Sequence, residues 1–480
     1  MIEWRRRFCG SDFLLRMLIQ RIFPDILLIK QHHIREANGD GNSLKAFRDE
    51  NGGKTRTCIA VMKWSCATVA GGGLLLACVV ATPNFCSAAP ADDSKSVTRA
   101  RLERIQSLRK ERPNDGLLIF YEAITRIDLG DRDAAFALLR SLQGWKLGLV
   151  PVRDAGFEGV WNDSEFQKIR EKLANEEPRT PDAPVAFRLA DPKLIPEGIA
   201  YDAKQDRSFV GSVALKKIVS ANPKGEVKDF SKAEDNLDCV LGLFVDAAHD
   251  QLYAVSTNGF LDEGQKQRRN TVVRYDLKNG LLVNRYDAPD ANQLNDLIVA
   301  ADGTIYATDS AGGTLFRKKP AEKMLTRVRA KGALPGANGI TLGANGSLYV
   351  AISTGIARIN LSTVAPTRLP QPDTVVTGGC DGLYWHNGDL VGIQNVTNPG
   401  RVIRIALADQ GTRISGVTVL QSHHHPEFTE PTTGAITGDA LYVIANSYVG
   451  HFQPNGSVKD PEQLKQTAIV AVPLGSTRQH

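Results

Sequence analysis

Between Pro196 and Gly434 the chain repeats one short pattern six times, in which a variable residue is followed by Gly or Asp and then by an apolar segment. The copies begin at Glu197, Leu241, Asn295, Asn338, Asp381 and Thr433. Their starts lie 44, 54, 43, 43 and 52 residues apart, a spacing typical of four-stranded propeller blades. The pattern therefore predicts a mainly β chain whose residues 185–474 form a six-bladed β-propeller.

A further apolar segment, Val185–Leu189, precedes the first copy. A propeller avoids long exposed sheet edges only when its first and last blades join. We therefore expect this segment to add a strand to the last blade and to close the ring.

The net charge of +5 comes from the first 63 residues, which hold twelve Lys or Arg and seven Asp or Glu. Residues 64–480 are therefore neutral. A protein that binds nucleic acid needs a basic surface to neutralise phosphates. We expect no nucleic-acid partner for the propeller.

Residues 62–88 have the pattern of a secretory signal peptide, with Met62 and Lys63, an apolar stretch, and small residues ahead of Ala89. We therefore expect a periplasmic or secreted protein whose mature chain has no membrane span. Residues 1–61 would then be an over-extended start, with Met62 as the true initiator, or a disordered segment. A cytoplasmic tail before a membrane anchor, and a lipoprotein signal at Cys78, stay open as alternatives.

Five of the seven cysteines lie at or before Cys86, so the exported chain would keep only Cys239 and Cys380. These two precede copies that are three blades apart in the repeat pattern, which is too far for a disulfide. We expect both to be buried and unpaired.

Residues 97–175 show helical rather than strand spacing of apolar residues. The stretch from Pro113 to Leu142 resembles a single tetratricopeptide repeat, which cannot bury its own apolar face. We expect this small helical domain to pack on its neighbours or on the propeller, and a docking platform for a protein partner is the alternative. Residues 176–184, rich in proline, are expected to form a linker.

The first residue of each copy should face the central channel of a propeller, where equivalent positions of different blades converge. Glu197 and Asp381 supply two carboxylates there, and Asn295 and Asn338 supply two amides. This all-oxygen set suits one divalent cation, with calcium as the first expectation and magnesium, manganese or zinc as alternatives. The competing interpretation is that Asn or Asp before Gly only forms turns, although Glu197 does not fit it.

Four stretches together resemble the senescence-marker protein, gluconolactonase and luciferin-regenerating enzyme family of six-bladed propellers. They are Pro196-Glu197-Gly198, Leu294-Asn295-Asp296 with the following Asp302-Gly303 and Thr308-Asp309, Ala337-Asn338-Gly339-Ile340, and Cys380-Asp381-Gly382-Leu383. The resemblance implies that Glu197, Asn338 and Asp381 bind the ion, and that Asn295 binds the ion or the substrate. It also implies that the ion polarises a lactone or ester carbonyl while Asp381 helps a water molecule to attack.

The chain departs from the family at Ile199, where proline is frequent, and at Gln293, where sugar-lactone members tend to carry arginine. The substrate is therefore expected to be a small lactone or ester other than a typical sugar acid. Candidate substrate contacts are Asn295, Gln293, His425 and Thr433. His425 belongs to a run of three histidines that could shuttle protons or hold a second metal, or could simply be an exposed His-rich loop.

Two other functions remain open from the sequence. The propeller could be a non-catalytic binding module in which the cation is structural, with a ligand or protein partner. A condensing enzyme similar to strictosidine synthase is a third option, although that chemistry does not need this set of oxygen ligands. The sequence therefore leaves open whether the chain is an enzyme, and the geometry of the site has to be considered.

Overall fold

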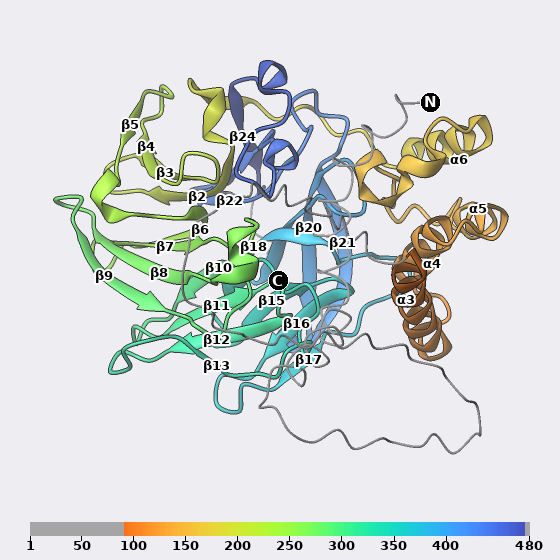
Figure 1. Cartoon of the computed structure of the whole chain (residues 1–480), viewed down its shortest axis with the longest axis horizontal. Helices are drawn as coiled ribbons and strands as arrows, with labels where there is room; N and C mark the ends of the chain where they lie inside the picture. The colour runs from red at the N-terminus through yellow and green to blue at the C-terminus, as the bar shows by residue number, and fades with distance from the viewer. Residues whose placement is uncertain (1–90, 476–480) are drawn as a thin grey trace, which may run out of the picture.

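The structure is a computed structural model that describes residues 91–475 (Figure 1). The predicted signal peptide at 62–88 and the segment 1–61 lie outside the described residues. Within residues 91–475, none of the helices combines the length and the apolar character needed to cross a membrane.

Six four-stranded antiparallel sheets form the propeller, which confirms the predicted fold. The first three blades run in chain order from the innermost strand outwards. Their strands are β2 (Pro196–Asp202), β3 (Arg207–Ser212), β4 (Ile218–Ala221) and β5 (Val227–Asp229); β6 (Cys239–Asp246), β7 (Gln251–Thr257), β8 (Asn270–Asp276) and β9 (Leu282–Asp287); and β10 (Leu294–Val299), β11 (Ile305–Asp309), β12 (Thr314–Lys318) and β13 (Thr326–Arg327).

The fourth and fifth blades follow the same order. Their strands are β14 (Ile340–Leu342), β15 (Leu348–Ile352), β16 (Gly355–Ile359) and β17 (Pro366–Arg368); and β18 (Cys380–His386), β19 (Asp389–Gln394), β20 (Arg401–Ala408) and β21 (Arg413–Gln421).

The sixth blade closes the ring. It contains β22 (Gly434–Thr437), β23 (Ala440–Ile444), β24 (Thr467–Pro473) and, from the start of the propeller, β1 (Val185–Leu189). The outer strand β1 pairs antiparallel with β24, so Leu189 lies opposite Thr467. The predicted closing strand is confirmed, and a sheet formed from both ends of the propeller holds the ring together.

Apolar side chains pack between neighbouring blades and position their inner strands around the channel. Between the first two blades, for example, Phe209, Leu252 and Tyr275 belong to one buried cluster. The second strands β11 and β15 are buried at every residue, which explains their short apolar runs without polar alternation. Cys239 and Cys380 are both buried, and they form no disulfide with each other, as expected from their positions.

Within residues 91–475, four α-helices precede the ring: α3 (Ala91–Glu111), α4 (Gly116–Asp128), α5 (Arg132–Ser141) and α6 (Ser164–Asn175). Short helical turns at Arg153–Phe157 and Glu158–Val160 lie between α5 and α6. The Asp115 side chain caps α4 by accepting from the N–H groups of Leu117 and Leu118. Phe120, Phe136, Phe157 and Phe166 form the centre of this helical region.

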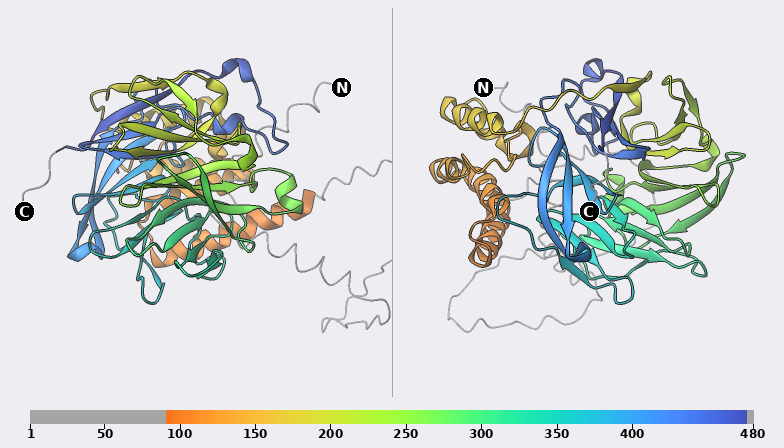
Figure 2. Two further views of the ribbon diagram at one scale, coloured as in Figure 1. Left: turned by 90° about the vertical axis from the view of Figure 1, so that its left-hand side faces the viewer. Right: turned by 180° about the vertical axis from the view of Figure 1, so that it is seen from behind.

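The helical region packs against the fourth and fifth blades (Figures 1 and 2). Tyr121 on α4 donates from its hydroxyl to the carbonyl of Ser353 at 2.9 Å, and the N–H of Val150 donates to the carbonyl of Thr397 at 3.0 Å. Arg401 forms an ion pair with Glu177 at 2.9 Å, and these side chains are only 4% and 1% exposed. The apolar face of the helices is therefore covered by the propeller.

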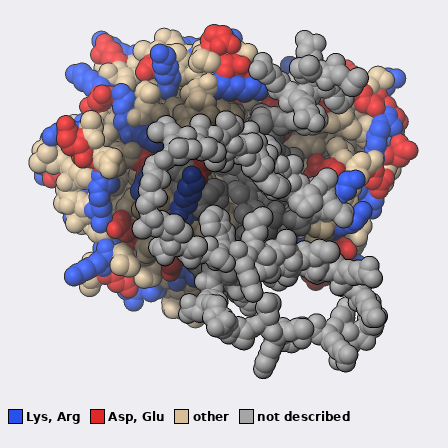
Figure 3. Space-filling view, viewed as in Figure 1, with Lys and Arg blue, Asp and Glu red and all other residues tan. Residues whose placement is uncertain are grey.

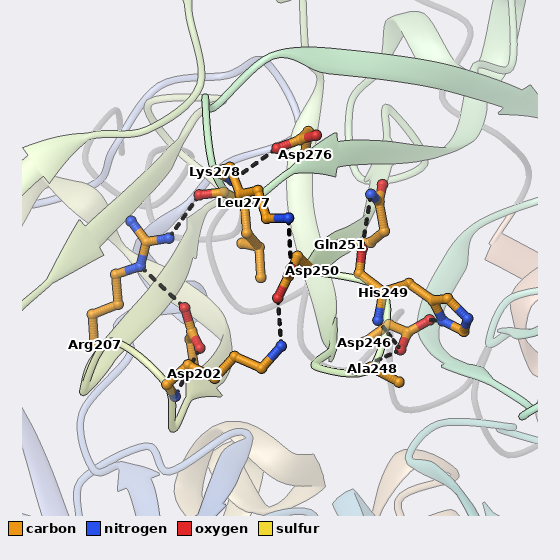
Figure 4. A network of polar contacts seen from close by, with 11 residues as sticks. Asp202, Arg207, Asp246, Ala248, His249, Asp250, Gln251, Asp276, Leu277 and Lys278 are labelled. Carbon is orange, nitrogen blue, oxygen red and sulfur yellow. Dashed lines mark hydrogen bonds and ion pairs between the residues drawn. The ribbon is translucent and has the colours of Figure 1, made fainter.

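Each blade has two different ends. We call the end where the innermost strand begins the site end, because the six repeated residues lie there. We call the other end, where a turn joins the first and second strands, the far end. Figure 4 shows a far-end network in which turns of the first two blades meet: Lys204 contacts Asp250 at 2.6 Å, and Arg207 donates to the carbonyl of Leu277 at 3.0 Å.

Candidate functional site

A break in strand register turns most of the repeated side chains toward the channel. In four blades the ladder between the first two strands shifts at the repeated residue, at Pro196/Gly198, Val240/Leu243, Leu294/Leu297 and Cys380/Gly382. Such a β-bulge interrupts the alternation of side chains and re-aims one of them. In the fourth and sixth blades, Asn338 and Thr433 come just before their strands, so the regular pairing has not yet begun.

The repeated side chains are buried. Relative exposure is 6% or less at all six positions, Glu197, Leu241, Asn295, Asn338, Asp381 and Thr433. Burying carboxylates without compensating contacts is unfavourable, so their surroundings decide what the site can do.

Asp381 is the best-defined group of the site. Its Oδ1 accepts a hydrogen bond from Nδ2 of Asn338 at 2.5 Å, and its Oδ2 accepts one from Nδ2 of Asn395 at 2.6 Å. Asn395 also donates to the carbonyl of Pro431 at 2.8 Å. Within residues 91–475, Asp381 has no Lys, Arg or His partner, so its negative charge is met by neutral amides alone.

Hydrogen bonds also connect the other blades at this level. The hydroxyl of Thr433 donates to the carbonyl of Glu197 at 2.6 Å, which joins the sixth blade to the first. Asn295 donates from Nδ2 to the hydroxyl of Ser310 at 2.9 Å, and Ser310 donates to the carbonyl of Ala337, the residue before Asn338. The predicted residues are thus brought to one end of one channel from different blades.

A cavity of about 390 Å³ opens above these residues. Glu197, Asp381 and Asn395 line it from the channel. Val152 and Asp154 of the helical region line it from the opposite side, and Glu430 lines it from the loop that enters the sixth blade. The helical region therefore forms part of the wall of the site.

The donor set fits a hard divalent cation. The Oδ1 atoms of Asn338 and Asn395 are buried and have no hydrogen-bond donor in the part of the chain that the structure describes. Together with the carboxylates of Glu197 and Asp381 they form an oxygen-only set, which suits calcium, magnesium or manganese better than zinc. The described residues contain no group of three or more His, Cys, Asp or Glu side chains that could hold a metal, so amide oxygens would have to contribute.

Two half-buried carboxyls near Asp381, those of Asp296 and Glu430, have unusual pKa values. Burial, with the charge of Asp381 acting in the same direction, raises the pKa of Asp296 to about 7, although the N–H groups of Leu297 and Ile340 donate to its carboxylate and oppose the shift. Burial also raises the pKa of Glu430 to about 7, with further contributions from Asp381 and Asp154. The channel therefore has a negative potential that a cation would relieve.

None of the four predicted substrate contacts, Asn295, Gln293, His425 and Thr433, lines the cavity. Both ring nitrogens of His425 are engaged, since Nε2 lies 2.9 Å from the carbonyl of Ala183 and Nδ1 accepts from the N–H of Glu427 at 3.1 Å. Gln293 is buried, and its backbone N–H donates to Asp309 at 2.9 Å. Neither residue lines the cavity, and neither does Thr433, whose neighbour Thr432 does.

Asn395, Glu430 and Asp154 are site residues that the repeat pattern did not reveal. Asn395 follows the second strand of its blade, and in an antiparallel pair this position lies beside the start of the first strand, as the pairing of Cys380 with Gln394 shows. The residue after each second strand is therefore a sequence signal that could have found Asn395. No comparable local signal marks Asp154, which reaches the cavity only through the packing of the helices.

Comparisons with family models and with curated proteins each give no match. Similar solved structures include a gluconolactonase from Xanthomonas campestris, 19% identical with 56% of this chain and 96% of that chain covered, at a TM-score of 0.39. A luciferin-regenerating enzyme is 14% identical, covers 59% and 92% of the two chains, and has a TM-score of 0.40. The PQQ-bound aldose sugar dehydrogenase of Streptomyces coelicolor is 14% identical, with 62% and 99% covered and a TM-score of 0.42.

The chain is a six-bladed β-propeller with a small helical region before it. Its structural neighbours include gluconolactonase and luciferin-regenerating enzyme, the group that the sequence motifs resemble. A fold alone does not determine the reaction, which has to be argued from the site.

Proposed function

We propose that the protein is an exported, metal-dependent hydrolase that opens a lactone or a related ester in the cavity between the propeller and the helical region. The observation that carries this proposal is the environment of Asp381. Its carboxylate is buried and held by two amides, Asn338 and Asn395, whose own oxygens lack donors among the described residues. This arrangement positions a base and leaves oxygen ligands available beside it.

Glu197, Asn338 and Asp381 would hold the cation, and Asn295 would hold it or contact the substrate. When bound, such a cation supplies Lewis-acid polarisation of a carbonyl. Asp381 would accept a proton from an attacking water molecule, because it lines the cavity and its orientation is fixed from two sides. Asn338 and Asn395 would keep its two oxygens in position through the reaction.

The decisive variant is Asp381→Asn, which keeps the size of the side chain and removes the base. Loss of a general base typically costs about 10²- to 10⁴-fold in rate, so hydrolysis of a responsive substrate from a panel of lactones and esters should fall by that amount. Glu197→Gln should weaken calcium binding, measured by calorimetry. The exposed Asp409→Asn is the matched control and should leave both properties unchanged.

The main competing function is a binding module with a structural cation. Metal-loaded wild-type protein that hydrolyses no member of the panel would support that alternative and contradict ours. Export is tested separately by sequencing the N-terminus of the mature protein, which we expect to begin at Ala89.

A further inference from the structure

The cavity is far more acidic than basic. Besides Glu197 and Asp381, four acidic side chains line it from three separate segments, Asp154, Glu158, Glu430 and Asp460. The basic side chains of the lining are Lys459 and His451. Even when a divalent cation offsets Glu197 and Asp381, the remaining acidic residues outnumber the single lysine.

Three of these carboxylates, Asp154, Glu430 and Asp460, lack a cationic partner within the described residues. The side chain of Asp154 makes no ion pair or hydrogen bond there, and Glu430 is contacted by the N–H of Gly450 at 2.9 Å rather than by a cation. Glu158, by contrast, approaches Arg153 at 3.8 Å. The charges of Asp154 and Asp381 both act on Glu430, and with burial they raise its pKa. Asp154 and Glu430 therefore both line the cavity, and neither has a cationic partner among the described residues.

A second, independent observation points to a ligand. Asn398 is fully buried and lines the same cavity. Its Oδ1 accepts from the N–H of Gly400 at 2.8 Å, whereas its Nδ2 has no acceptor in residues 91–475. A buried amide donor is normally satisfied, so an acceptor such as a carbonyl oxygen is expected from the ligand. Phe260 and Tyr448 add aromatic walls, which favour a nearby ammonium group.

We propose that the ligand of this cavity combines a protonated amine with a carbonyl group, so that the ammonium lies between Asp154 and Glu430 and the carbonyl accepts a hydrogen bond from Asn398. The inference rests on the proposed function only in taking the carbonyl to belong to a lactone or ester. It assigns the substrate to amino-substituted lactones or esters and excludes lactones that carry a carboxylate, which the acidic lining would repel. The helical region then acts in substrate selection, because it supplies Asp154.

The test uses three five-membered lactams that differ in charge and cannot report on ester hydrolysis. They are 3-aminopyrrolidin-2-one as the cation, pyrrolidin-2-one as the neutral compound and 5-oxoproline as the anion, titrated into the calcium-loaded full-length mature protein by calorimetry. We expect the cation to bind about tenfold or more tightly than the neutral lactam, and the anion to bind more weakly than both. Equal affinities, a preference for the anion, or no binding of any lactam would overturn the inference.

Variants separate the two contacts. Asp154→Asn and Glu430→Gln should each reduce the preference for the cation, whereas Asp133→Asn, an exposed acid of α5 outside the cavity, should leave it unchanged. Asn398→Leu should weaken all three lactams without changing their order, and the neutral variant Asn398→Ala provides the same test if the leucine variant does not fold. An unchanged preference in both acidic variants would contradict the proposal. Failed ester hydrolysis with the charge preference intact would contradict only the proposed function.

Discussion

The two ends of the blades treat carboxylates in opposite ways. At the far end, Asp250 contacts Lys204 at 2.6 Å and Lys278 at 3.2 Å, and these lysines are 55% and 74% exposed (Figure 4). At the site end, Asp381 is buried and contacts only amides among the described residues. Asp250 is thus neutralised by flexible lysines, whereas Asp381 is held by neutral amides.

The local backbone explains this difference. At the far end, turns connect the first and second strands, and their charged side chains extend into water. Exposed charges are also mixed in sign on the site-end face, where Figure 3 shows positive and negative side chains interspersed wherever the described surface is visible. At the site end, bulges turn the repeated residues inward, where surrounding blades and the helical region exclude water. The contribution of each charged side chain to the free energy of unfolding should therefore depend on its burial, which variants can test.

The largest effect on stability is expected at the buried ion pair that joins the helical region to the propeller. Arg401→Met leaves Glu177 buried without its partner and should lower the free energy of unfolding by about 3–5 kcal/mol. The same variant should loosen the cavity wall, because Arg401 also donates to the carbonyl of Leu147 at 3.1 Å. Urea unfolding of the wild type and the variant measures the difference.

The double variant Arg401→Met, Glu177→Met is the matched control for that experiment. Removing both charges avoids a lone buried carboxylate, so the double variant should be more stable than the single one. A single variant within about 1 kcal/mol of the wild type would mean that this pair behaves like an exposed one.

An intermediate effect on stability is expected at Glu430, and this effect should depend on pH. Burial raises the pKa of this carboxyl to about 7 in the folded protein, whereas in the unfolded chain the pKa returns to its ordinary value of 4.5. The unfolded state therefore binds fewer protons between these values, and the contribution of Glu430 to stability falls as pH rises through this window. Glu430→Gln should reduce the loss of thermal stability between about pH 5 and pH 7.5, measured in the presence of a chelator.

Asp296 should preserve part of the pH dependence in that variant, because burial also raises its pKa to about 7. Glu427→Gln is a suitable control in the same loop. Arg188 lowers the pKa of Glu427, so this residue contributes stability that is lost as pH falls, which is the opposite sign. An identical pH profile of stability in Glu430→Gln and the wild type would show that the pKa of Glu430 is not raised in the folded protein.

The sequence predicted the parts of the site that repeat. Glu197, Asn338 and Asp381 were found because each begins a copy of the same pattern, and the ring geometry then requires them to converge. The repeat pattern does not predict residues that reach the cavity through long-range packing. Asp154 is one of these, since contacts such as Tyr121 with Ser353, 232 residues apart, and Arg401 with Glu177, 224 apart, fix where the helices lie. No local spacing encodes such a docking position.

The smallest effect on stability is expected at the far end, where the proposed dependence on burial is easiest to disprove. Asp250→Asn removes both lysine contacts, yet exposed ion pairs contribute only about 0.2–1 kcal/mol each and are weakened by salt. We therefore expect only a small loss of unfolding free energy, far below that of Arg401→Met, and a smaller loss still in high salt. Hydrolysis and lactam binding should not change, because Asp250 lies at the opposite end of the blade from the cavity. A loss of unfolding free energy as large as that of Arg401→Met would show that burial does not determine how much these charged groups contribute to stability. The contrast between the two ends would then need another explanation.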